Sequence, residues 1–168
     1  DSRGRNTIVI GPGANAALST EFIEAQRALL AGAGVVLAQL ESPVETIEAV
    51  LAAAREAGVT TVLNPAPADA PSSIGLLKLA DVLTPNETEF AALLERHTSH
   101  RIEPDAIVGT ADAQLHRLCR TLLPRGTVVV TLGAAGAFVS HREDLLRGDS
   151  AAFYRVAAER VESIDTTG

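Results

Sequence analysis

Apolar and polar positions along the 168-residue chain follow two alternating patterns, one typical of buried strands and one typical of helices. Short apolar or β-branched runs predict strands, because strands of a parallel sheet carry nearly continuous apolar side chains. These runs are residues 6–10, 35–40, 60–63, 81–83, 127–131, 137–140, 153–156 and 161–164. Apolar residues that recur every three or four positions predict helices. These segments are residues 19–31, 43–57, 73–79, 87–96 and 112–123.

Capping signals mark where several of these helices begin and end. Ser19 is a candidate N-cap for the first helix. Ser42, Pro43 and Glu45 match a capping box with proline at the first helical position, and Gly58 ends that helix. Residues 97–109 are polar and lack a clear period, which predicts a surface loop.

The alternation of strand and helix predicts the fold class. Strand–helix units of this kind form a parallel sheet covered by helices. We therefore expect a Rossmann-like, doubly wound α/β fold, with a mainly parallel sheet and helices on both faces. At 168 residues, the chain has the length of a single domain.

Composition narrows the class of protein. The chain has 14 basic and 21 acidic residues, and aromatic residues make up 3%, so neither a basic face nor a base-stacking surface for nucleic acid is expected. It contains no apolar run long enough for a membrane span.

The absence of Met leads us to expect a processed chain or a piece of a longer protein. The polar start predicts no signal peptide and a cytoplasmic location. The single cysteine, Cys119, shares a helical face with leucines and is expected to be a core thiol.

Polar residues and glycines recur just past the predicted strands. Open parallel sheets bind ligands beyond the carboxyl ends of their strands, and one sheet edge would gather these residues. They are Glu41, Asn64, Asn86, Glu89, Gly133, Gly136, Asp165 and Thr167.

Most of these positions have a local explanation beside a functional one. Glu41 could be only a first-turn carboxylate beside the Ser42 cap. Gly133 and Gly136 could form a plain turn, or their backbone N–H groups could hold phosphate oxygens. Asn86 and Glu89 fit an N-cap with its capping-box partner, or a carboxylate near Mg²⁺. Residues 165–168 could be a turn or could supply oxygen ligands to a cation. The four histidines share no metal-ligand spacing.

Six segments, taken in their order along the chain, favour the functional explanations over the local ones. Together they resemble ribokinase and its relatives, the phosphofructokinase-B-type sugar kinases. The resemblance covers the chain from about residue 6 onward and rests on residues 13–16, 39–43, 64–68, 84–89, 131–136 and 165–168.

The resemblance implies a phosphotransferase with ATP as co-substrate and Mg²⁺ and K⁺ as cofactors. In this family a sugar hydroxymethyl group attacks the γ-phosphate of ATP, and in ribokinase D-ribose becomes D-ribose 5-phosphate. A homodimer of the full-length protein is expected. The implied roles are sugar binding for Glu41, ATP binding for Asn86, Thr131, Gly133 and Gly136, Mg²⁺ binding through water for Glu89, and K⁺ binding for Asp165 and Thr167.

Two parts of the family pattern are absent from these 168 residues. The Asp-Thr-Thr-Gly segment continues in the family as Ala-Gly-Asp, which supplies the catalytic base and an anion hole, and this chain stops at Gly168. The lid and the front of the sugar pocket would precede Asp1. Residues 1–168 are therefore expected to be the central part of one ribokinase-like domain, with no catalytic base and no activity alone. Two alternatives stay open: another sugar or nucleoside kinase of the family, and a non-catalytic nucleotide- or sugar-sensing domain.

Overall fold

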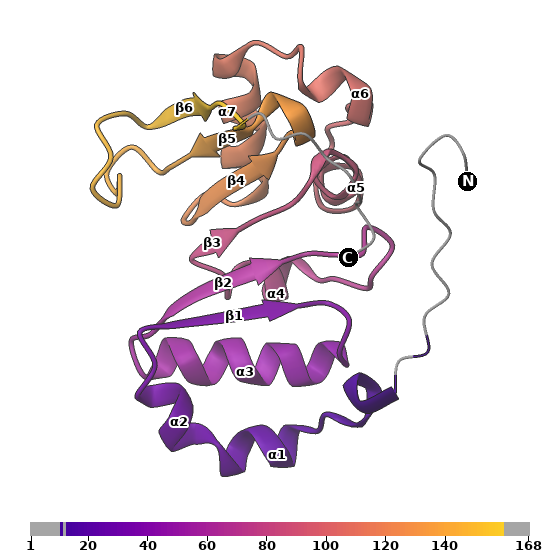
Figure 1. Ribbon diagram of the computed structural model, residues 1–168, viewed down its shortest axis with the longest axis vertical. Helices are drawn as coiled ribbons and strands as arrows, with labels where there is room; N and C mark the ends of the chain where they lie inside the picture. The colour runs from indigo at the N-terminus through magenta and orange to yellow at the C-terminus, as the bar shows by residue number, and fades with distance from the viewer. Residues whose placement is uncertain (1–10, 12, 160–168) are drawn as a thin grey trace.

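The computed structural model describes residue 11 and residues 13–159 of the chain (Figure 1). Its elements, in chain order, are η1 (Gly13–Ala17), α1 (Thr20–Ala25), α2 (Arg27–Ala31), β1 (Val35–Gln39), α3 (Val44–Glu56), β2 (Thr60–Asn64), α4 (Ile74–Leu77), β3 (Val82–Leu83), α5 (Glu87–His97), α6 (Pro104–Ile107), α7 (Asp112–Leu122), β4 (Thr127–Thr131), η2 (Gly133–Ala135), β5 (Ala137–Ser140) and β6 (Phe153–Val156). No helix in this part of the chain is long and apolar enough to cross a membrane.

The strands form one six-stranded sheet in the order β1-β2-β3-β4-β5-β6. Strands β1 to β4 are parallel to one another, whereas β5 and β6 continue the sheet as antiparallel strands. The α/β class and the mainly parallel sheet predicted from the sequence are therefore confirmed. In Figure 1 the arrows of β1 and β2 point to the right, so the carboxyl ends of these strands lie on that side.

The core lies between the sheet and the helices that connect its strands. Right-handed crossovers between neighbouring parallel strands in chain order place every connecting helix on the same face of a sheet. The burial of β1 agrees, because Val36 and Ala38 are buried while Val35 and Leu37 on the opposite face are 58% and 69% exposed. The described residues thus contain one of the two helical layers that the sequence analysis expects.

The first helices begin and end differently from the predictions. Ser19 does cap α1, and its hydroxyl accepts the backbone N–H three residues on at 3.3 Å. The helix predicted over residues 19–31 is interrupted at Gln26, which separates α1 from α2. The capping box predicted at Ser42 is wrong, because α3 begins one residue later than expected. Pro43 is the N-cap there, and no side chain caps the helix.

The segment 97–109, predicted as a loop, contains the short helix α6. The segment is mostly polar, but the side chain of Ile107 is fully buried in the main core and holds the helix against it. The strands predicted at residues 6–10 and 161–164 lie outside the described residues.

Cys119 is a core side chain, as the sequence predicts. It is fully buried on α7, and this burial raises the pKa of its thiol to about 12. A thiolate is the nucleophilic form of cysteine, and an apolar environment disfavours it. Cys119 therefore contributes packing rather than chemistry.

Two half-buried histidines should make folding stability depend on pH. Desolvation lowers the pKa of His97 and of His116, helped by Arg96 and Arg120 respectively. In the unfolded chain their pKa is about 6.5, so below that pH the unfolded state binds more protons and stability falls. We expect unfolding free energy, measured by urea titration, to decrease as the pH falls from about 7.5 to about 5.5.

Replacing the two histidines tests their part in this dependence. The double variant His97→Gln and His116→Gln should have a smaller slope of stability against pH in that range. Gln114, an exposed residue of α7 that does not titrate, provides the control, and Gln114→Ala should leave the slope unchanged. An unchanged slope in the double variant would assign the pH dependence to other groups.

Candidate functional site at the carboxyl ends of the strands

A cavity of about 560 Å³ lies at the carboxyl ends of the parallel strands. It falls in the size range of about 300–1,000 Å³ that is usual for small-molecule sites. Residues from or just beyond the ends of β1 to β4, and from the start of α5, form its walls. They are Leu37, Gln39, Asn64, Ala66, Thr84, Asn86, Glu89 and Thr131.

Asn86 and Glu89 form a capping box at the first turn of α5. The side-chain oxygen of Asn86 accepts the backbone N–H of Glu89 at 2.8 Å. The Glu89 carboxylate accepts the backbone N–H of Asn86 at 2.9 Å and its amide Nδ2–H at 3.0 Å. Glu89 is only 6% exposed, yet its side chain lines the cavity. The local explanation is thus confirmed, and the same geometry places a fixed carboxylate at the cavity wall.

Thr131 ends β4 and lines the cavity, whereas Gly133 lies two residues further on and is not one of its lining residues. Thr131 pairs with Asn86 as an isolated parallel bridge, and its N–H donates to the carbonyl of Pro85 at 2.9 Å. Gly133 has a φ of +50°, and no atom lies within 4 Å of the position that a Cβ would take. The first N–H groups of a 3₁₀ turn have no partner within the turn. The start of η2 at Gly133 therefore offers N–H groups beside open space.

Gly136 requires glycine for a structural reason. Its φ is +91°, and a Cβ there would lie 1.9 Å from the backbone oxygen of Val156 and 2.7 Å from the nitrogen of Ala158. The close approach of this backbone explains the glycine without any ligand. Gly136 does not line the cavity, so its expected contact with ATP stays a prediction.

Asn64 holds the neighbouring strand ends together. Its side-chain oxygen accepts the N–H of Ala66 at 3.1 Å, and its Nδ2–H donates to the carbonyl of Thr84 at 3.4 Å. The carbonyl of Ala66 in turn accepts the N–H of Leu40 at 3.1 Å. These bonds fix the backbone just before Glu41, which is exposed and does not line the cavity.

The predicted row of residues at one sheet edge is confirmed as far as the described residues reach. Asn64 is the last residue of β2, and Glu41, Asn86 and Gly133 lie two or three residues past the ends of the parallel strands β1, β3 and β4. Asp165 and Thr167, the predicted K⁺ ligands, lie outside the described residues, and their role stays a prediction.

The Glu89 carboxylate has the chemistry that a hydrated magnesium ion would need, the cofactor that the resemblance implies. Between residues 13 and 159, no three His, Cys, Asp or Glu side chains gather as a ready-made metal cluster. Mg²⁺ keeps several waters and usually needs one or two carboxylates besides phosphate oxygens. Each oxygen of Glu89 accepts one bond from Asn86 and keeps lone pairs for a water ligand. Glu89 can therefore face the hydrated ion without any rearrangement.

Gln39, Thr84 and Leu37 line the cavity although sequence reasoning did not select them. Gln39 pairs in register with Asn64, and in parallel strands paired residues point to the same face. The available signal was one polar residue inside an otherwise apolar strand. Gln39 was not predicted to line a site because residues 35–40 read as one uniformly buried strand.

Comparison with known proteins places these features in a family. The whole chain, residues 1–168, matches the pfkB family of carbohydrate kinases. The chain is 33% identical to the ribokinase of Schizosaccharomyces pombe over 99% of its own length and 48% of that protein. It is 37% identical to the ribokinase of Haemophilus influenzae, over 82% of this chain and 42% of that one. The chain thus spans about half the length of the curated relatives it matches.

The fold of this chain is also similar to that of a solved ribokinase structure. Ribokinase from Arabidopsis thaliana, solved in complex with ribose and ATP, superposes with a TM-score of 0.65 at 30% identity. The match covers 99% of this chain and 49% of the plant protein. The sheet, the strand-end cavity and a family match over all 168 residues together show that the chain belongs to the pfkB family of carbohydrate kinases.

Proposed function

We propose that the natural protein carrying this chain is an ATP-dependent sugar kinase that phosphorylates D-ribose at its hydroxymethyl group. One observation carries this proposal: Asn86, Glu89 and Thr131 line a single cavity at the carboxyl edge of the sheet, in a chain that matches the pfkB family. The proposal concerns the longer protein, because the chain spans about half of its relatives. Inactivity of the 168 residues alone stays a prediction.

The side of the cavity near α5 suits the phosphates of ATP. The N-terminus of the eleven-residue helix α5 carries the positive end of its dipole, which favours anions. The start of η2 at Gly133, two residues past the lining residue Thr131, offers backbone N–H groups, and Asn86 supplies a side-chain amide. The Glu89 carboxylate alone would repel bare phosphates, and it would hold, through water, a Mg²⁺ ion whose charge would offset that repulsion. The residues of this chain then orient the phosphates, since phosphoryl transfer depends mainly on positioning and charge stabilisation.

The region just past the end of β1, beside the cavity, suits the sugar. Glu41 follows β1, and the bonded turn of Asn64 and Ala66 holds the backbone before it. A carboxylate at this place can accept hydrogen bonds from sugar hydroxyls, which orients the hydroxymethyl group toward the phosphates. Removal of the proton from that hydroxyl is assigned to an Asp of the family pattern beyond Gly168.

A substrate panel tests the proposal. The natural protein is assayed for ADP release with D-ribose, 2-deoxy-D-ribose, fructose and adenosine, and ³¹P NMR identifies the product. We expect D-ribose to have the highest kcat/KM and the phosphate to be attached to O5. Preference for another acceptor would show that the protein is a sugar or nucleoside kinase of the family with a different substrate. ATP or ribose binding without any turnover would favour a sensing domain.

Glu41→Ala should weaken ribose binding in the natural protein. Loss of a charge-assisted hydrogen bond typically costs about 1.5 kcal/mol or more, so we expect the KM for ribose to rise at least about tenfold. The KM for ATP should stay unchanged, because Glu41 lies at the other side of the edge. Glu45→Ala removes a carboxylate four residues further along the chain, in the first turn of α3, and serves as the control. An unchanged KM for ribose would remove Glu41 from the sugar site.

A further inference from the structure

A second pocket lies at the opposite edge of the sheet, where the parallel strands begin. Its volume is about 430 Å³, which again suits a small molecule. It shares no lining residue with the candidate functional site. We name it the amino-edge pocket, and it is lined by Arg55, Lys78, Ala80, Asp81, Leu123, Pro124 and Arg125.

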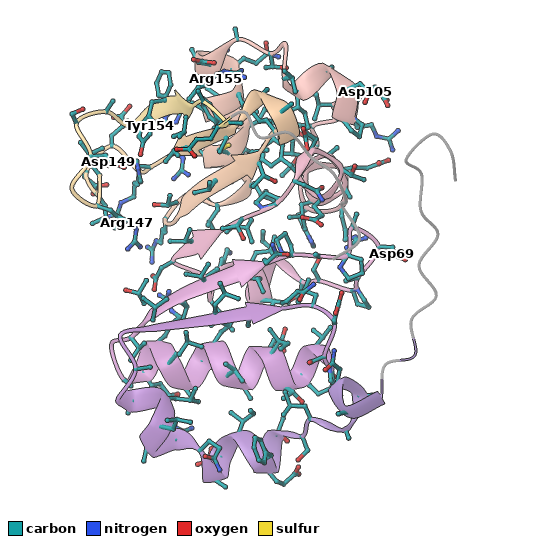
Figure 2. The ribbon with its side chains drawn as sticks, in the orientation of Figure 1. Asp69, Asp105, Arg147, Asp149, Tyr154 and Arg155 are labelled. Carbon is teal, nitrogen blue, oxygen red and sulfur yellow. The ribbon has the colours of Figure 1, made fainter. Side chains whose placement is uncertain are left out.

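Positive charge gathers at this pocket from separate parts of the chain. Arg55 lies in the last turn of α3, Lys78 is the C-cap of α4, and Arg125 lies between α7 and β4. Arg147, from the segment between β5 and β6, donates to the backbone carbonyl of Asp81 at 3.4 Å. Figure 2 shows Arg147 on the left, the side on which β1 and β2 begin. This concentration of cations occurs in a chain whose net charge is −7.

The one carboxylate that lines the pocket is already engaged. Asp81 accepts Arg55 through Oδ1 at 3.0 Å. Its Oδ2 accepts the backbone N–H and the hydroxyl of Thr61 at 3.0 and 3.1 Å. Lys78 and Arg125 have no ion-pair partner within the described part of the chain. Two cations therefore face the pocket without a counter-charge.

Helix ends explain only part of this cluster. Arg55 and Lys78 lie at helix C-termini, where cations offset the negative end of the dipole. Arg125 belongs to no helix. Arg147 has a φ of +53°, a conformation that costs energy for a residue with a side chain. Its guanidinium contacts Thr127 and the Asp81 backbone from that conformation. These two arginines add positive charge that no helix end requires.

We propose that the amino-edge pocket binds the phosphate group of a small phosphorylated molecule. The guanidinium of Arg125 and the ammonium of Lys78 donate to the phosphate oxygens, since both side chains recognise this group. Ala80, Leu123 and Pro124 form an apolar wall for the carbon skeleton of the ligand. The inference does not depend on the proposed kinase activity, because it uses none of the residues of the candidate functional site.

Residue-resolved NMR on the natural protein tests the location. The ¹⁵N-labelled protein is titrated with inorganic phosphate and, separately, with ribose 5-phosphate, while ribose is the uncharged control. Both probes carry the proposed group, and a shift with either one at the amides of Ala80 and Gly126 supports the site. A shift with ribose 5-phosphate alone shows in addition that the apolar wall contributes. Shifts confined to Thr131 and Gly133, or none at all, would overturn the proposal.

Paired arginine variants test the contact. Arg125→Gln should raise the dissociation constant of the bound probe at least about tenfold, because this is the loss of affinity expected when one charge-assisted hydrogen bond is removed. Arg117→Gln removes the same charge from an exposed position on α7 and should leave it unchanged at about 0.15 M salt, where distant charges are screened. Both side chains are exposed, so folding should be preserved. Equal dissociation constants for the two variants would contradict the proposal.

Discussion

Glu89→Gln is expected to lower the kcat of the natural protein by about 10–100-fold, the usual range for losing a group that supports metal ligands. The change removes the negative charge from the cavity wall while keeping the shape of the side chain. Raising the Mg²⁺ concentration should restore part of the rate. Steady-state kinetics over a range of Mg²⁺ concentrations measure both effects.

Stability separates this role from helix capping. Both Glu89 oxygens accept bonds from Asn86, so glutamine loses one of the two at a cost of about 1 kcal/mol. Ser73→Ala provides a matched control, because Ser73 caps α4 by accepting the N–H of Leu76 at 2.9 Å and its loss also costs about 1 kcal/mol. The control should keep its kcat. Full activity of Glu89→Gln at limiting Mg²⁺ would leave Glu89 with the capping role alone.

Gly136→Ala is expected to destabilise the protein by about 3–5 kcal/mol, the sum of backbone strain and overpacking. Its φ of +91° disfavours any residue with a side chain, and the new Cβ would lie 1.9 Å from the Val156 oxygen. The colliding atoms are backbone, so no rotamer change relieves them. Urea unfolding measures the loss, and the junction between η2 and β6 should be the part that separates first.

Gly58→Ala is the control for Gly136→Ala. Gly58 has a φ of +73°, and nothing lies within 4 Å of its potential Cβ. Alanine there costs only the left-handed conformation, about 1–2 kcal/mol. Equal losses in the two variants would show that the approach of Val156 does not constrain Gly136.

Local signals predicted much of the fold and part of the site. The apolar runs of β1, β2 and β4 are within one residue of the observed strands, because buried parallel strands have a distinctive composition. Asn86 and Glu89 are three residues apart, so the sequence alone indicates their capping box. The edge rule for parallel sheets then placed Asn64 and Asn86 at the same cavity.

Features that depend on distant residues could not be predicted this way. The constraint on Gly136 comes from residues 156–158, twenty positions along the chain. Gln39 joins the cavity through its register with Asn64, which appears only once β1 and β2 are paired. The amino-edge pocket combines residues from α3, α4 and the α7–β4 segment, and no local pattern connects them.

A crystal structure of the natural protein with D-ribose and a non-hydrolysable ATP analogue would test the proposed site most directly. We predict that the triphosphate lies between the start of η2 at Gly133 and the capping box of Asn86 and Glu89. Ribose should contact Glu41, with its O5 directed at the terminal phosphate. A triphosphate bound elsewhere, for example at Lys78 and Arg125 on the opposite edge of the sheet, would contradict the assignment of the carboxyl-edge cavity as the kinase site.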